Sequence, residues 1–144
     1  MSYENPWTYN GVLVDSELVV NFCGFVYNIT NLSNGRKYIG KKLLKKTKTH
    51  QVKGKKKKTL IDSDWKDYYG SNKELIEDVA NIGAHNFNRE IIRLCKTKGE
   101  CNYWEAKYQF EYKVLESADY YNSWIMVKVH QNHLPKNETI GNII

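Results

Sequence analysis

The chain has 144 residues, of which 41% are hydrophobic and 13% aromatic, and its formal net charge is +6. These values exclude a disordered chain and favour one folded domain with a hydrophobic core. There is no run of the ~18 apolar residues that a membrane helix needs, no signal peptide opens the sequence, and three cysteines without metal-ligand spacing favour a reduced, cytoplasmic protein.

Residues 1–20 are mixed in character, and we predict that they form an N-terminal segment that covers the core. No residue pattern in this segment points to chemistry. The apolar side chains expected to pack there are Trp7, Leu13, Leu18, Val19 and Val20.

The segment 24–40 is predicted to be a β-hairpin. Its first strand is rich in β-branched and aromatic residues, and Asn34-Gly35 is a strong turn signal because both residues tolerate positive φ. The return strand follows directly and ends at a glycine. Tyr27 and Tyr38 would then lie on paired strands, which fits ordinary aromatic cross-strand packing as well as a functional site.

Positive charge is concentrated directly after this hairpin. Twelve of the 22 basic residues lie between Arg36 and Lys58, where there is no Asp or Glu, and the rest of the chain carries ten basic and 16 acidic residues. Residues 41–63 lack an apolar stripe, so we predict a long basic loop that is mobile in the free protein and ordered by nucleic-acid phosphates. The alternative is a solvated charged run. The predicted DNA contacts in this segment are Lys41, Lys45, Lys46, Lys48, His50, Lys53, Lys55, Lys56, Lys57 and Lys58.

An aromatic segment and a helix follow the basic loop. Trp65 lies beside the loop with two tyrosines, where it would either stack on bases or pack in the core beneath the loop. Ser71 or Asn72 is a good N-cap, and Glu74 has the spacing of a capping box with Ser71. We therefore predict a helix from this point that stops before Gly83.

Residues 87–95 are predicted to form a third strand, with Arg89 and Arg93 exposed as phosphate contacts. A long amphipathic helix is predicted to start near residue 101 and to carry Glu105 in its first turn. In this helix Glu105 follows directly after the large apolar residue Trp104.

The order of the elements predicts an α+β fold, in which a small three-stranded antiparallel sheet is flanked by helices and carries the long basic loop. The main domain is predicted to span residues 21–130. Residues 124–130 are strand-like, and residues 131–144 form a loose C-terminal tail.

Four features of the sequence together resemble the GIY-YIG nuclease family. Residues 38–40 (Tyr-Ile-Gly) match the second half of the family's hairpin motif, and Tyr27 stands at the tyrosine of the first half, where Phe25 replaces the usual glycine. Glu105 matches the glutamate in the helix after the third strand, and Asn122 matches the asparagine that follows this helix.

The resemblance implies a metal-dependent DNA endonuclease. It makes Glu105 the ligand of one divalent ion, Mg²⁺ or Mn²⁺, with Tyr27, Tyr38, Asn122 and a basic residue as the other catalytic groups. The family usually has an arginine after the motif, and we expect Lys42 to replace it as a point charge that cannot fork two phosphate oxygens. The implied partner is duplex DNA, with a homodimer as an open option. The implied setting is a small stand-alone bacteriophage-type nuclease, homing types included, that acts in the host cytoplasm.

Two other functions remain compatible with the same residues. One is a nucleic-acid-binding module that keeps the fold without cleavage, and the other is a structural protein that uses only its charge to bind a polyanion. An enzyme should lose cleavage and keep binding on Glu105→Gln, whereas the other two should show no metal-dependent cleavage. His50 is either a proton-transfer group or a solvated histidine.

Overall fold

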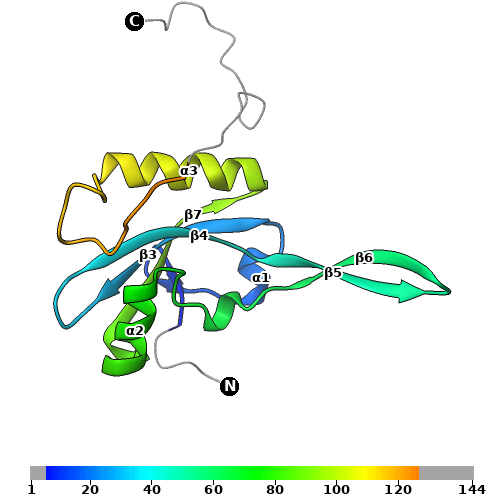
Figure 1. Cartoon of the computed structure of the whole chain (residues 1–144), viewed down its shortest axis with the longest axis horizontal. Helices are drawn as coiled ribbons and strands as arrows, with labels where there is room; N and C mark the ends of the chain where they lie inside the picture. Colours follow the sequence, from blue (N-terminus) through cyan, green and yellow to red (C-terminus); the bar gives the residue numbers. More distant parts are fainter. Residues whose placement is uncertain (1–5, 127–144) are drawn as a thin grey trace, which may run out of the picture.

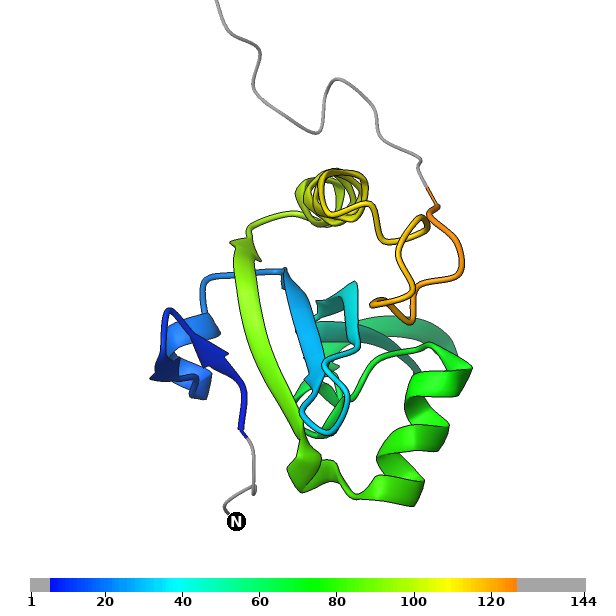
Figure 2. The same ribbon diagram turned by 90° about the vertical axis from the view of Figure 1, so that its left-hand side faces the viewer.

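The computed structural model describes residues 6–126 and contains a five-stranded mixed sheet in the order β2-β1-β7-β3-β4. Helix α3 lies over one face of the sheet, and α2 lies on the other side (Figures 1 and 2). The strands of the sheet are β1 (Thr8–Tyr9), β2 (Val12–Leu13), β3 (Gly24–Asn31), β4 (Lys37–Leu43) and β7 (Phe87–Cys95). The helices are α1 (Ser16–Val19), α2 (Lys73–Ile82) and α3 (Lys98–Glu111), with short 3-10 turns η1 (Trp65–Asp67) and η2 (Ala84–Asn86). Among these described helices, none is long and apolar enough to cross a membrane.

Strands β3, β4 and β7 form the predicted antiparallel sheet, with β3 in the middle. The prediction of only three strands was wrong, because β1 joins β7 in parallel and β2 pairs with β1. Asn10 and Gly11, with φ of 51° and 79°, form the two-residue turn between β1 and β2. Both residues adopt positive φ with little strain, which permits a tight hairpin of primed type.

A β-bulge in the pairing of β3 with β7 sends two arginines to opposite faces of the sheet. Arg89 lies before the bulge and shares its face with Phe87 and Ile91. The bulge is the shift in register between Val26 and Tyr27, and Arg93 beyond it points to the other face. Arg89 is 0% exposed and donates to the backbone carbonyls of Lys66 and Tyr68 at 2.9 Å each. The prediction that Arg89 is exposed was therefore wrong, because it stands in the period-2 row of buried side chains.

Residues 45–62 form a two-stranded antiparallel hairpin, here called the basic ribbon, and not the predicted loop. Its strands are β5 (Lys45–Val52) and β6 (Lys55–Asp62). Lys53 and Gly54, with φ of 52° and 78°, form its turn, again with both residues at positive φ. The ribbon projects away from the body of the protein (Figure 1). Its side chains are exposed on both faces except for the half-buried His50 and Ile61, which explains why no apolar stripe marks these strands in the sequence.

The two long helices begin at side-chain caps. The side chain of Asn72 accepts from the Leu75 N–H at 3.0 Å, and α2 ends before Gly83 at φ 104°, as predicted. Helix α3 begins about a turn earlier than predicted, because Thr97 accepts from the Glu100 N–H at 3.0 Å. Glu105 therefore lies in the middle of α3 and not in its first turn.

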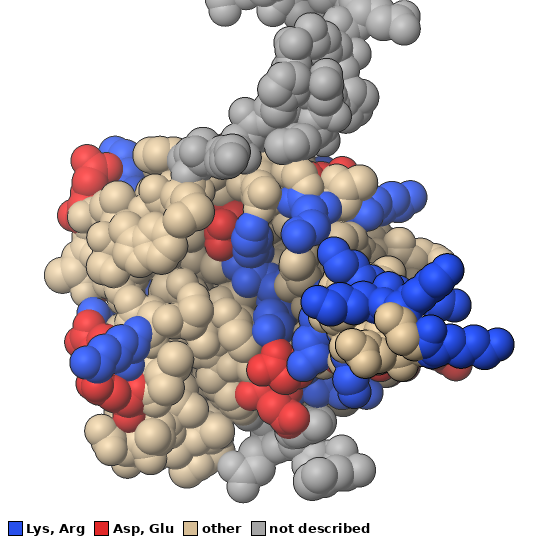
Figure 3. Space-filling model, turned by 45° about the vertical axis from the view of Figure 1, so that its right-hand side comes forward, with Lys and Arg blue, Asp and Glu red and all other residues tan. Residues whose placement is uncertain are grey.

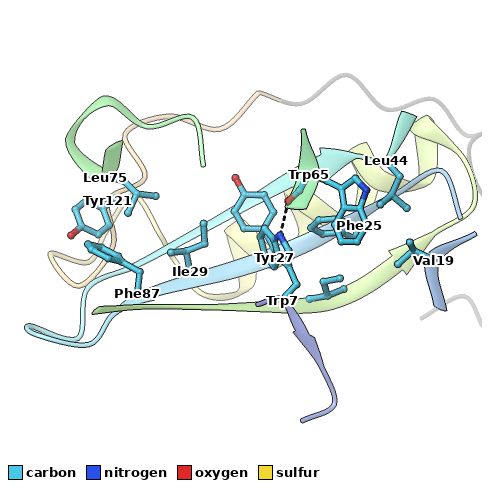
Figure 4. Close-up of a cluster of buried hydrophobic side chains, with 11 residues drawn as sticks. Trp7, Val19, Phe25, Tyr27, Ile29, Leu44, Trp65, Leu75, Phe87 and Tyr121 are labelled. Carbon is cyan, nitrogen blue, oxygen red and sulfur yellow. Dashed lines mark hydrogen bonds between the residues drawn. The ribbon is translucent and has the colours of Figure 1, made fainter. Parts of the chain in front are cut away.

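The core consists of one apolar cluster on each face of the sheet. On the α2 side, aromatic rings from β3, from η1 and from Trp7 pack edge to face around Phe25 and Tyr27 (Figure 4). The Trp7 indole N–H donates to the Trp65 carbonyl at 2.7 Å, which fixes η1 against the sheet. On the α3 side the cluster is smaller and consists of Val26, Ile39, Cys95, Cys101 and Val114.

The C-terminal strand predicted over residues 124–130 is absent from 124–126. The remainder of that strand and the predicted tail at 131–144 lie outside the described residues.

Candidate active site

The site is built along the free edge of β4, the last strand of the sheet. Lys37 exchanges backbone hydrogen bonds with the segment after α3, donating to the Asp119 carbonyl at 2.8 Å and accepting from the Tyr121 N–H at 2.7 Å. The Ile39 N–H donates to Asn122 Oδ1 at 3.1 Å, and the Ile39 carbonyl accepts from Asn122 Nδ2 at 2.8 Å. The Asn122 amide thus replaces the peptide group of a neighbouring strand, so that this edge has no unpaired backbone groups at Ile39.

Glu105 lies beside the same edge of β4 as Asn122. The backbone and the positive charge of Lys41, the next outward-facing residue of β4, act to lower the pKa of the Glu105 carboxyl group. Gln109, one turn further along α3, donates to the Ile39 carbonyl at 2.8 Å. Helix α3 therefore fixes the position of Glu105 along β4, the strand that carries Tyr38.

Gly40 allows the two tyrosines of the hairpin to approach each other. It pairs with Tyr27 across the β3–β4 ladder. A Cβ atom at Gly40 would lie 2.5 Å from the Tyr27 hydroxyl and 2.9 Å from Tyr38 Cε2. The Tyr27 ring lies over this bare backbone, and the ring centroids of Tyr27 and Tyr38 are 6.1 Å apart.

The two tyrosine hydroxyls have different surroundings. Tyr27 is 0% exposed, and its hydroxyl lies 3.5 Å from that of Tyr68. Tyr38 is half-buried, and its hydroxyl lies 3.1 Å from Ser71 Oγ. Burial is the main cause that raises the pKa of each phenol, so both are protonated at neutral pH.

A cavity of about 410 Å³, here called the site cavity, opens beside the free edge of β4. It brings together the polar groups of β4, of α3 and of the start of α2. Burial raises the pKa of Glu105, and the positive charge of Lys41 opposes that rise. Lys41 Nζ donates to Asn102 Oδ1. The polar residues in its lining include Tyr38, Lys41, Ser71, Asn102, Glu105 and Gln109.

Lys42 does not reach this cavity. Successive residues of a strand point to opposite faces, so Lys41 and Lys42 diverge. Lys42 Nζ lies 2.6 Å from Asp64 Oδ1 and 4.1 Å from the centroid of the Tyr68 ring. The prediction of Lys42 as the basic residue of the site is not supported by this geometry, which places Lys41 there instead.

Asn122 also stands apart from the cavity that it was predicted to serve. It is 8% exposed, and both polar atoms of its amide are hydrogen-bonded to the backbone of Ile39, the residue between Tyr38 and Gly40. This arrangement makes Asn122 a positioning residue for β4.

The predicted DNA contacts divide into exposed and buried groups. The ribbon lysines are exposed, and Figure 3 shows them as a dense basic surface on the projecting arm. His50 lies on this ribbon opposite Lys57. Arg93 is half-buried, and its guanidinium lies 3.6 Å from the centroid of the Trp104 ring. Trp65 is only 4% exposed, so the core-packing alternative holds for this residue and the stacking prediction was wrong.

The oxygen donors of the site suit a hard cation that keeps most of its water. Within residues 6–126 no three His, Cys, Asp or Glu side chains cluster as a complete metal site. Mg²⁺ commonly binds through one or two carboxylates together with waters and substrate phosphates. Glu105 offers one such carboxylate in a cavity with room for a hydrated ion, and a bound cation would oppose the rise in its pKa.

Sequence reasoning did not assign Ser71, Asn102 and Gln109 to the site, although all three line the cavity. The one available signal was spacing on α3. Asn102, Glu105 and Gln109 follow one another at three and four residues, which places them on one face of a helix.

Comparisons with known proteins identify a family and a relative of this chain. A family described as "Putative endonuclease segE, GIY-YIG domain" matches residues 7–125. The chain is also 34% identical over 98 residues to a protein of Enterobacteria phage T4 described as "Putative endonuclease segE". That match covers 68% of this chain and 39% of the phage protein, so the chain spans well under half the length of this relative. No significant match was found among solved structures.

Proposed function

Because the chain belongs to the GIY-YIG nuclease family, we propose that it is an endonuclease that hydrolyses phosphodiester bonds of duplex DNA with one divalent metal ion. The observation that carries this proposal is the site cavity, where Tyr38, Lys41 and Glu105 meet beside the free edge of β4. The description of the phage relative as an endonuclease supports the same reaction.

Phosphodiester hydrolysis requires a positioned water, stabilisation of negative charge on the phosphate, and neutralisation of the leaving oxygen. The Tyr38 hydroxyl is protonated at neutral pH, since burial raises its pKa further above the ordinary value for a phenol, so we assign it to orienting the attacking water. Ser71 fixes the direction of that hydroxyl. Lys41 supplies positive charge for a non-bridging phosphate oxygen.

Glu105 is the residue proposed to hold the metal ion. When bound, a divalent ion supplies Lewis-acid stabilisation of the phosphate and of the leaving oxygen. The chain's contribution is to keep the carboxylate in place, because Glu105 lies in the middle of α3 and beside Lys41 in the wall of the site cavity.

The basic ribbon is proposed to bind the duplex. It carries Lys55, Lys56, Lys57 and Lys58 in succession, and β5 adds further lysines. It has no Phe, Tyr or Trp side chain on which an unpaired base could stack, and its one imidazole, His50, is half-buried, which disfavours single strands as its target. A two-stranded ribbon fits the major groove of B-form DNA, whereas the major groove of an RNA duplex is too deep and narrow for side chains to read.

A supercoiled plasmid tests the proposal. Wild type should nick or linearise the plasmid with Mg²⁺ or Mn²⁺ and not with EDTA. Glu105→Gln should abolish cleavage and leave DNA affinity equal or higher, because it removes the ion ligand together with a negative charge. Glu111→Gln, at the exposed end of the same helix, is the matched control and should cleave normally.

Metal binding is measured separately, by calorimetry with Mn²⁺ and no DNA, and should be weakened by Glu105→Gln alone. A wild-type protein that binds the plasmid but cuts it under none of these conditions would favour the non-catalytic module.

A further inference from the structure

A second hollow, here called the basic groove, lies at the base of the ribbon and has a volume of about 810 Å³. Three separate parts of the chain contribute lysines to it: the end of β4 with the first residues of β5, the end of β7, and the start of α3. These lysines are Lys41, Lys42, Lys45, Lys46, Lys96 and Lys98. We propose that this groove holds the phosphate backbone of the duplex on one side of the cleaved bond, and that Lys96 and Lys98 are DNA contacts.

The groove and the site cavity share Lys41 in their walls. A strand whose phosphate lies beside Glu105 therefore meets the groove on passing Lys41. The ribbon begins at the far side of the same groove, with Lys45, Lys46 and Thr47 in its wall. Cavity, groove and ribbon thus form one continuous basic path, and the proposal rests on the function assigned above.

The charges in the groove are only partly compensated. Asp64 is the acidic residue in its wall, and it pairs with Lys42. Asp62, at the end of the ribbon, pairs with Lys45. Within the described part of the chain, Lys96 and Lys98 are exposed, and neither ammonium group has a carboxylate at ion-pair distance. Their charge is available to an external anion.

The base of the ribbon is fixed to the body, so the groove has a defined shape. Leu44 is only 2% exposed in the core between β4 and β5. The Ser63 N–H donates to the Leu44 carbonyl at 2.9 Å, and Ser63 Oγ donates to the Leu43 carbonyl at 2.6 Å. These bonds hold both ends of the ribbon against the sheet.

The chemistry of the groove suits the DNA backbone better than bases. Lysines act as point charges without the planar fork that reads base edges. The Lys42 ammonium lies over the Tyr68 ring in the wall, so that face of the ring is not free for stacking. The contribution of the groove should therefore be independent of sequence and sensitive to salt.

The test compares two double variants in the Glu105→Gln background, which prevents cleavage during binding. Lys96→Gln/Lys98→Gln removes two groove charges, and Lys107→Gln/Lys113→Gln removes two exposed charges on α3 or just beyond its end. Binding of a 30-base-pair duplex is followed by fluorescence anisotropy as salt is varied. The groove variant should lower the slope of log K against log salt by about 1.8, because each duplex phosphate contact contributes ~0.9.

The affinity of the groove variant at 0.1 M salt should fall by up to about 60-fold, which is the same slope change applied over one decade of salt. The control variant should keep the slope of its parent. Equal slopes for the groove variant and its parent, or equal losses in both double variants, would overturn the groove proposal. If wild type also fails to bind or cleave the plasmid, the proposed function fails instead. Both variants change exposed side chains, and matching thermal melts would show that each is folded.

Discussion

Gly40→Ala is the sharpest test of the tyrosine arrangement. The added methyl carbon would lie 2.5 Å from the Tyr27 hydroxyl oxygen, 2.8 Å from Tyr27 Cζ and 2.9 Å from Tyr38 Cε2. The Tyr27 ring cannot withdraw, because it is fully buried and packs against Trp7 and Phe25 at centroid distances of 5.4 and 6.2 Å. We therefore expect the strain to fall on both tyrosines.

An extra methyl group forced into a packed core costs about 1–3 kcal/mol, and each kcal/mol lowers the melting temperature of a domain of this size by roughly 3–5 °C. Tyr27→Phe removes the atom that the new methyl meets first. The free-energy cost of Gly40→Ala should therefore be smaller by about 1 kcal/mol in the Tyr27→Phe background, within the range of couplings between residues in contact.

The assay is urea unfolding of the four proteins in this double-mutant cycle, followed by fluorescence, with plasmid cleavage measured in parallel. Gly40→Ala should also cleave at least about tenfold more slowly, because displacement of Tyr38 costs the positioning of a reacting group. A Gly40→Ala protein as stable as wild type, or an equal cost in both backgrounds, would refute the reasoning from this contact.

Three further outcomes follow from the site. Burial raises the pKa of Glu105, so its ionised form destabilises the fold. In EDTA, Glu105→Gln should therefore raise the melting temperature at pH 7.5 but not below the ordinary glutamate pKa of ~4.3. A difference in melting temperature that does not change with pH would count against a buried, ionised Glu105. Lys41→Met should slow single-turnover cleavage at saturating DNA, whereas Lys42→Met should mainly weaken binding, and the reverse pattern would restore Lys42 to the site. Asn122→Asp keeps the acceptor for the Ile39 N–H but places a second oxygen against the Ile39 carbonyl. It should lower the free energy of unfolding by about 1–3 kcal/mol and reduce cleavage. An unchanged midpoint of denaturant unfolding would contradict the role of Asn122 at the edge of β4.

The parts of the fold that the sequence predicted correctly are those with local signals. Asn34-Gly35 marked the β3–β4 hairpin, and Gly35 has the expected positive φ of 78°. Asn72 and Gly83 marked the two ends of α2. The strand predicted over 87–95, from its apolar residues Phe87, Ile91 and Ile92, coincides with β7.

The basic ribbon escaped prediction because a strand exposed on both faces has no apolar period. Its turn, Lys53-Gly54, was the one local signal, since glycine tolerates the positive φ that a tight hairpin requires. Thr97 with Glu100 gave a similar short signal for the true start of α3, which the sequence reading passed over.

Two of the predicted site residues lie together, and their catalytic roles stay predictions. Tyr38 and Glu105 line the same cavity, as expected from the resemblance. Lys41 and Lys42 could not be told apart by position alone, because the choice depends on which face of β4 meets α3. Arg89 was predicted to be an exposed charge, but it lies between Phe87 and Ile91 in the row of buried side chains on one face of β7.

The attachment of the basic ribbon has a consequence for engineering and for divergence. The ribbon leaves the body at Leu44 and returns at Ser63, two residues joined directly by a backbone hydrogen bond of 2.9 Å. Everything between them makes its own ladder and contributes no strand to the main sheet. A tight two-residue turn could therefore replace residues 45–62 and leave the sheet closed at that point. The same junction would accept arms of other lengths and charges, and under the proposed function such an exchange would alter DNA binding while Tyr38, Lys41 and Glu105 stay in place.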